Sequence, residues 1–172
     1  MRFLLSLAAL LATAAVAGDA PPGPEAAVAD LWRALSNEPG AAANMAALKR
    51  LFHRDAIVFG ARLQSGKRAL RVTSAVKFIE AQAIPGEKGF YECEIHRSVK
   101  RYGRLAAVYS VVESRSREDQ GPPDFAGVNS LQLYLSDDGW KLVSLYYHLE
   151  EKDAPIPLEG GASGRCLRAG PD

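Results

Sequence analysis

The most regular alternation of apolar and polar residues lies between Gly127 and Leu149. It is interrupted by Ser136-Asp137-Asp138-Gly139, and Asp-Gly adopts the positive φ angles of a tight turn, so the pattern predicts a β-hairpin. The incoming strand has an apolar side made of Leu131, Leu133 and Leu135. The matching side of the outgoing strand has Val143, Leu145, Tyr147 and Leu149. The opposite side has Trp140, Leu142, Ser144, Tyr146 and His148.

Three segments nearer the start repeat their apolar residues at helical spacing. The first helix is expected to begin near Pro24, and the second to run from about residue 41 to 52. A third follows Thr73 or Ser74, either of which can cap it, and stops before Pro85-Gly86. The apolar residues of the first helix are Val28, Leu31, Trp32 and Leu35. Those of the second are Met45, Leu48 and Phe52, and those of the third are Val76, Ile79 and Ala83.

The remaining periodic segments predict strands. Residues 56–59 form a short one, and residues 90–102 and 105–113 form two long ones before the hairpin. Residues 60–71 are expected to be a polar connection, and residues 114–126 a charged, mobile loop. Helices that precede a mainly antiparallel sheet indicate an α+β fold in which three helices cover one concave face.

The two ends of the chain differ from this domain in composition. Residues 1–17 have a basic start, an apolar run and a small-x-small end, which predicts a secretory signal. A membrane anchor is disfavoured because the run is short and rich in Ala. We therefore expect a periplasmic or secreted protein with a linker at 18–23, one domain at 24–152 and a flexible tail at 153–172, which is rich in Pro and Gly.

Composition argues against several classes of function. Without Arg2, the 21 basic residues become 20, which balance 20 acidic residues, so nucleic acid or an acidic membrane would meet no basic field. Three scattered histidines and the absence of a Gly-rich phosphate loop indicate neither a metal nor a nucleotide, so no cofactor is expected. Cys93 and Cys166 could pair in an oxidising compartment, or Cys93 could be buried while Cys166 stays free.

Four stretches resemble the nuclear transport factor 2-like superfamily, which includes SnoaL-like polyketide cyclases and ketosteroid isomerases. They are Leu31-Trp32-Arg33-Ala34-Leu35, Leu51-Phe52-His53-Arg54-Asp55-Ala56, Gly103-Arg104-Leu105-Ala106-Ala107-Val108 and Asp138-Gly139-Trp140-Lys141-Leu142-Val143. The resemblance spans roughly residues 24–149. It implies a curved sheet wrapped round the helices as a cone-shaped, cystatin-like roll with a deep apolar pocket, and a homodimer through the outer sheet face.

The resemblance does not fix a reaction, because such folds host unrelated chemistries. In ketosteroid isomerases the general base aligns with about Gly60 of this chain and the protonated oxyanion donor with about Leu131, and neither side chain can exchange a proton. The first helix carries Trp32 where a tyrosine donor would be needed. The sequence therefore argues against steroid isomerisation.

Candidate chemistry follows from extending the apolar face to the strand at 105–113. That assignment points Tyr109 and Glu113 into the cavity, together with Leu105, Ala107 and Val111. A desolvated Glu113 could act as an acid or base near neutral pH, unless it is simply solvated at the strand end. Tyr109 and Tyr147 could orient a ligand carbonyl or be core aromatics. The expected pocket lining also includes Trp32, Phe59 and Leu133.

Three hypotheses follow. The first is an exported protein that binds a small hydrophobic molecule without a catalytic set. The second is an isomerase, cyclase or dehydratase that uses Glu113 with Tyr109 or Tyr147. The third is an interaction module that docks to itself or to a partner through the outer face of the hairpin. We expect His148 on that face and His96 on the outer face of its own strand. We expect no contact with nucleic acid and, after signal cleavage, none with a membrane.

Overall fold

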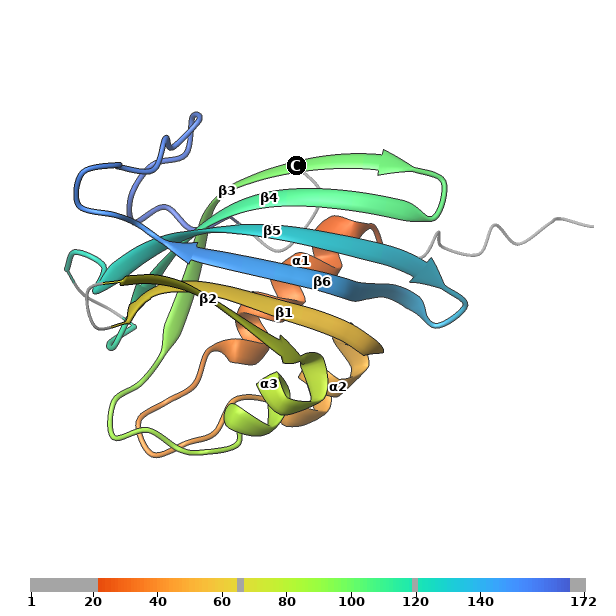
Figure 1. The fold of residues 1–172 in the computed structure, drawn as a ribbon, viewed down its shortest axis with the longest axis horizontal. Coiled ribbons are helices and arrows are strands. Elements are labelled where there is room, and N and C mark those ends of the chain that lie inside the picture. Colours follow the sequence, from red (N-terminus) through yellow and green to blue (C-terminus); the bar gives the residue numbers. More distant parts are fainter. Residues whose placement is uncertain (1–21, 65–66, 119–120, 168–172) are drawn as a thin grey trace, which may run out of the picture.

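The computed structural model describes residues 22–64, 67–118 and 121–167, and within them the chain is α+β, as predicted. Figure 1 shows the three helices and six strands of this part. The helices are α1 (Pro24–Leu35), α2 (Met45–Leu51) and α3 (Ala75–Ala81). The strands are β1 (Phe52–Gln64), β2 (Lys67–Ser74), β3 (Tyr91–Tyr102), β4 (Leu105–Arg115), β5 (Phe125–Ser136) and β6 (Gly139–Leu149). None of these helices is both long and apolar enough to span a membrane.

The strands form one curved, mixed sheet in the order β2-β1-β6-β5-β4-β3. β1 and β6 run parallel, and each other neighbouring pair is antiparallel. The predicted hairpin is β5–β6, with Leu131 opposite Leu145 and a turn completed by Gly139 at φ 102°. A side chain at that φ would be strained, so glycine suits the position.

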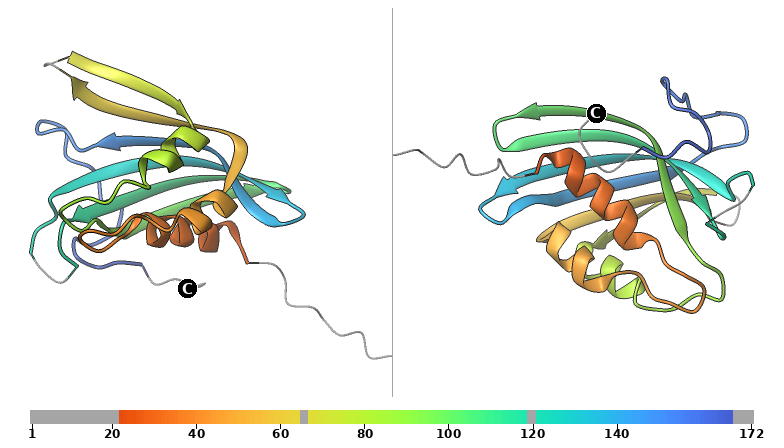
Figure 2. Two further views of the ribbon diagram at one scale, coloured as in Figure 1. Left: turned by 90° about the horizontal axis from the view of Figure 1, so that it is seen from below. Right: turned by 180° about the vertical axis from the view of Figure 1, so that it is seen from behind.

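The main core joins the helices to one face of the sheet. Val28 and Leu31 of α1 are fully buried together with Leu131 and Leu133 of β5. Figure 2 shows α1 and α2 on the same side of the sheet. Burying a side chain of this size stabilises the fold by about 1.5–3 kcal/mol, so these contacts fix the face to which the helices bind.

Strict alternation along β6 was a wrong expectation. The register shifts between Gln132 and Leu133, which pair with Ser144 and Leu142, so Val143 is an extra residue that forms a β-bulge. Beyond the bulge the side chains change faces. Leu142 is therefore 0% and Trp140 6% exposed, and both belong to the core instead of the outer face.

The faces of β4 are the reverse of the prediction. Val108 pairs with Leu131 and Ala106 with Leu133, and directly opposed residues share a face of the sheet. The even-numbered residues of β4 therefore face the helices. Tyr109 and Glu113 point to the opposite side, together with Leu105, Ala107 and Val111.

Two further expectations change in the segment around α3. Within the predicted connection at residues 60–71, residues 60–64 belong to β1 and residues 67–71 to the antiparallel β2, so the sheet has one strand more than predicted. Ser74 does cap α3, accepting a hydrogen bond from the Lys77 amide at 3.4 Å. Of the apolar residues expected to face inward, Ile79 is buried, but Val76 is 51% exposed and Ala83 lies beyond the end of the helix.

The C-terminal segment lies against the outer face of β3 and β4. Cys93 and Cys166 form a disulfide, with Cα atoms 5.0 Å apart. Ile156 packs on a second apolar cluster that contains Cys93, Ile95 and Val111. The Leu167 amide donates to the Glu94 carbonyl at 2.6 Å. The segment through Leu167 is thus anchored at several points, while residues 168–172 lie outside the described residues and the flexibility of the tail stays a prediction.

Loss of the disulfide should destabilise the protein. The bond joins residues 73 positions apart, and a loop of that length limits the entropy of the unfolded chain. We expect Cys166→Ser to lower the free energy of unfolding by about 2–4 kcal/mol and the Tm by roughly 5–15 °C. A reductant should produce a similar shift in the wild type and none in the variant. Equal Tm values for oxidised wild type and variant would contradict this.

Candidate functional site

A cavity of about 240 Å³ opens between α1, the C-terminal end of α3 and strands β3 to β6. Its wall is largely apolar and includes five aromatic side chains. These are Trp32, Phe78, Phe90, Phe125 and Tyr147. The polar lining side chains include Gln82, Glu92, Ser114 and Asn129. Such a mixture of apolar surface with a few polar groups is typical of small-molecule sites.

Glu92 is the one acidic residue among the described residues that line this cavity. It pairs with Ser114 across β3 and β4, and the Ser114 hydroxyl donates to Glu92 Oε2 at 2.8 Å. Burial raises the pKa of Glu92 from 4.5 to about 7, and the hydrogen bond from Ser114 offsets only part of that rise. The carboxyl group therefore takes up or releases a proton near neutral pH.

Trp32 lines the cavity, but its indole N–H group is itself buried. Trp32 belongs to the buried side of α1, and its indole Nε1 has no hydrogen-bond partner among the described residues. Leaving such a group without a partner costs about 1–3 kcal/mol. That cost belongs to the folded protein itself, because the nitrogen is buried and is not on the exposed surface of the cavity.

Ser36 connects these two residues through the backbone. Its hydroxyl donates to the Trp32 carbonyl at 2.8 Å and accepts from the Glu92 amide at 2.9 Å. The C-terminal end of α1 is thereby fixed to the start of β3. The relative positions of Trp32 and Glu92 depend on this link.

Gly60 and Tyr147 explain why the isomerase pattern fails here. The two residues are paired between β1 and β6, and a side chain on Gly60 would collide with the phenol ring of Tyr147. Glycine is needed for this close approach. The position that aligns with the ketosteroid isomerase base is therefore covered by Tyr147.

The residues that the sequence analysis grouped in one pocket fall into three places. Trp32 and Tyr147 line the cavity. Leu133 is fully packed in the core. Phe59 lies on β1, one residue after the buried Val58, and pairs with Tyr146 on β6. It does not line the cavity.

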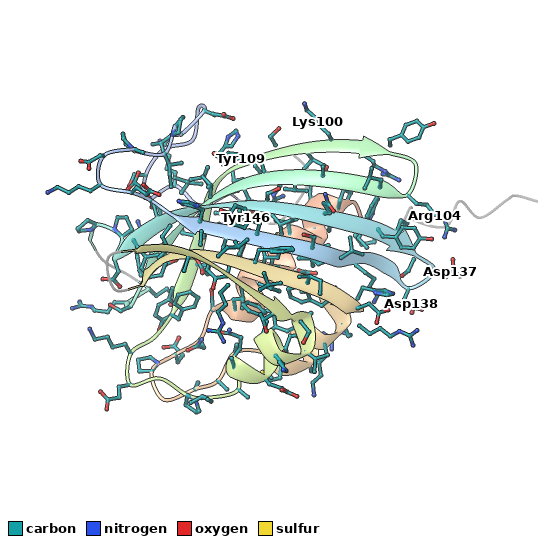
Figure 3. All side chains as sticks on the ribbon, viewed as in Figure 1. Lys100, Arg104, Tyr109, Asp137, Asp138 and Tyr146 are labelled. Atoms are coloured by element: carbon teal, nitrogen blue, oxygen red, sulfur yellow. A yellow bond between two sulfur atoms is a disulfide. The ribbon has the colours of Figure 1, made fainter. Side chains whose placement is uncertain are left out.

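Glu113 and Tyr109 do not reach the cavity. They lie on the face of the sheet opposite α1, where Figure 3 labels Tyr109, and Tyr109 packs against His96 with ring centroids 6.4 Å apart. Arg115 donates to Glu113 at 2.6 Å and the Gly164 amide donates at 2.9 Å. Burial alone would raise the pKa of Glu113, but hydrogen bonds from Ser163, Gly164 and Arg115 outweigh it and the pKa is lowered. Glu113 therefore anchors the C-terminal segment as an ionised group.

Two histidines are held by neighbouring groups. His148 borders the cavity, and its Nδ1 lies 3.0 Å from the Tyr146 hydroxyl while its Nε2 lies 3.1 Å from Glu151. His53 Nδ1 accepts from the Asp55 amide at 3.2 Å. In the part of the chain that the structure describes, no cluster of three or more His, Cys, Asp or Glu side chains is arranged to hold a metal ion.

Sequence reasoning missed Glu92 and Ser114 because β3 contains a register shift between Glu94 and His96. Near the turn Tyr102 pairs with Leu105, and an unbroken register would set Glu92 opposite Arg115 on the outer face. The shift sets it opposite Ser114, which faces the helices. The pairing of Glu92 with Ser114 on the neighbouring strand would have indicated the site. That pairing depends on a bulge that the pattern of apolar and polar residues does not reveal.

Several solved structures have a similar fold. A nuclear transport factor 2-like protein of unknown function from Silicibacter pomeroyi is 24% identical, covers 73% of this chain and 91% of its own, and has a TM-score of 0.50. One from Cytophaga hutchinsonii is 15% identical over 72% of this chain and 93% of its own, with a TM-score of 0.55. A protein of unknown function with a cystatin-like fold from Nostoc punctiforme is 14% identical, and the match covers 73% of this chain and 87% of that protein, with a TM-score of 0.54. No protein-family model and no curated protein matches the sequence.

The stability of the protein should depend on the proton of Glu92. A raised pKa in the folded state means that its favourable contribution is complete below the unfolded value of 4.5 and is lost as the pH rises through about 7. We expect Glu92→Gln to raise the free energy of unfolding by up to about 3 kcal/mol at pH 8 and to leave it nearly unchanged at pH 4.5. Urea denaturation at both pH values measures this. A variant that is no more stable than wild type at pH 8 would refute it.

Proposed function

We propose that this chain, which has a nuclear transport factor 2-like fold, binds a small and largely apolar molecule in the cavity lined by Glu92 and Trp32. The observation that carries the proposal is an apolar wall that contains one carboxyl group, Glu92, whose hydrogen bond from Ser114 offsets only part of the cost of its burial. A packed core excludes such groups. In this view α1, α3 and the concave side of a cone-shaped sheet form the receptacle.

The volume limits the size of the ligand. About 240 Å³ is below the roughly 300–1,000 Å³ of sites for drug-sized molecules. It equals about eight water molecules at roughly 30 Å³ each. We expect a compact ligand with about ten non-hydrogen atoms, such as one substituted aromatic or alicyclic ring.

An acid–base enzyme of the isomerase, cyclase or dehydratase type is the second candidate. Glu92 favours it, because a pKa of about 7 suits proton transfer at neutral pH. The roles first given to Glu113 and Tyr109 do not fit, since both lie on the other face of the sheet. Glu92 would take the role of the base or acid, with Ser114 positioning its carboxyl group.

Binding of a neutral apolar probe tests the leading proposal. We expect naphthalene to bind the wild type and Phe125→Ala, which removes a ring from the cavity wall, to weaken binding several-fold. Tyr134→Ala is the matched control, because Tyr134 lies in the same strand with 44% exposure against 41% for Phe125 but does not line the cavity. Isothermal titration calorimetry measures both. No binding by a folded wild-type protein would exclude the proposal.

Export is a separate part of the proposal. The disulfide between Cys93 and Cys166 suits an oxidising compartment, and residues 1–17 have the composition of a cleavable signal. A homodimer through the outer sheet face would have to form without Trp140 and Leu142, two of the residues expected to make it, because both are buried in the core.

Cleavage after Ala17 can be read from the mass of the intact protein. Expressed with its own N-terminus in a bacterial host, the chain should be recovered from the periplasm or medium with Gly18 as its first residue. Replacing Ala15 and Ala17 with bulky residues should block processing, because signal peptidase requires small side chains there. Unprocessed wild-type protein in the cytoplasm would contradict export.

A further inference from the structure

We propose that the ligand of this cavity is an organic cation with an apolar body, such as a lipophilic amine or a quaternary ammonium compound. The proposal rests on the ligand-binding function above and specifies its chemistry. Two features of the cavity carry it: the density of aromatic rings in its wall and a carboxylate that has no basic partner.

The aromatic rings come from five different parts of the fold. Trp32 belongs to α1, Phe78 to α3 and Tyr147 to β6. Phe90 and Phe125 precede and begin β3 and β5, and their ring centroids lie 6.4 Å apart. The faces of such rings attract a positive charge, most strongly where water is excluded. Several rings around one small space are the arrangement that recognises ammonium groups.

Glu92 is largely but not fully buried, and it differs from Glu94 and Glu113, the two fully buried carboxylates among the described residues. Glu94 is paired with Arg97, and Glu113 is paired with Arg115 at 2.6 Å. Glu92 accepts a hydrogen bond from the Ser114 hydroxyl, and no Lys or Arg is among the described residues lining its cavity. Buried charges are ordinarily paired, so the cation that complements Glu92 is expected to come from the ligand.

The charged groups near Glu92 do not replace that cation. On its other side Glu92 borders an open cleft lined by Arg33, Arg115 and Glu118. Arg33 is paired with Asp30 and Arg115 with Glu113. Tyr91 also borders the cleft, and Tyr147 and His148 border the cavity, where His148 is held by Tyr146 and Glu151.

The same features disfavour an anion. A carboxylate or phosphate ligand would meet an ionised Glu92 and no basic side chain in the cavity lining. A cation instead stabilises the ionised form of Glu92, so binding should release a proton. Affinity for a permanent cation should therefore rise as the pH increases through about 7 and level off above it.

A matched pair of probes separates charge from shape. Benzyltrimethylammonium carries a permanent positive charge, and neopentylbenzene has the same shape with carbon in place of nitrogen. Titration calorimetry at pH 8 should show that the wild type binds the cation at least about tenfold more tightly. Lowering the pH to 5.5 should weaken binding of the cation and leave that of the neutral probe unchanged.

Two variants identify the group responsible. Glu92→Gln should weaken binding of the cation about tenfold at pH 8, abolish its pH dependence and leave neopentylbenzene unaffected. Glu118→Gln makes the same change of charge in the adjacent cleft and should alter neither affinity. If Glu92→Gln leaves binding of the cation unchanged, the assignment of Glu92 is wrong.

The outcomes separate this inference from the function on which it rests. A protein that binds neopentylbenzene as tightly as the cation, or binds naphthalene but not the cation, overturns the inference and leaves the ligand-binding function intact. A folded protein that binds none of the three probes overturns both.

Discussion

The burial of Leu131 and Leu133 against α1 determines which side of every strand faces the helices. Each neighbouring strand takes its orientation from these two residues, through Val108 and Ala106 on one side and Leu145 and Leu142 on the other. In a sheet, a shift of one residue moves every side chain to the other face. The polar residues of the cavity are thus placed by apolar contacts that they do not themselves make.

Two of the register shifts in the sheet modify this plan, and the one in β3 affects the candidate site. The one in β6 returns Trp140 and Leu142 to the core, and the one in β3 turns Glu92 towards the cavity. Bulges often redirect side chains next to functional sites. Glu92 thereby enters an apolar environment where its charge is unfavourable, while Glu94 and Glu113 enter environments that supply an arginine.

The sequence predicted the helices and the terminal hairpin because their apolar periodicity is strong and local. It misassigned β4 because that strand is apolar on both faces: Val108 packs under the helices, whereas Val111 packs under the C-terminal segment. The segment that covers Val111 lies more than 40 positions away in the chain, so the sequence around β4 does not reveal that this face is buried. Glu92 was missed for a related reason, since its position depends on cross-strand register and not on its neighbours in the chain.

The bond between the Leu167 amide and the Glu94 carbonyl has a consequence for assembly. β3 is an edge strand of an unclosed sheet, and an edge carbonyl that lacks a partner can accept a strand from another molecule. The C-terminal segment occupies that acceptor, held there by the bond between Cys93 and Cys166. Before that bond forms the segment is held over this edge only by its other contacts, so we expect oxidation to shorten the time during which edge-to-edge association competes with correct folding.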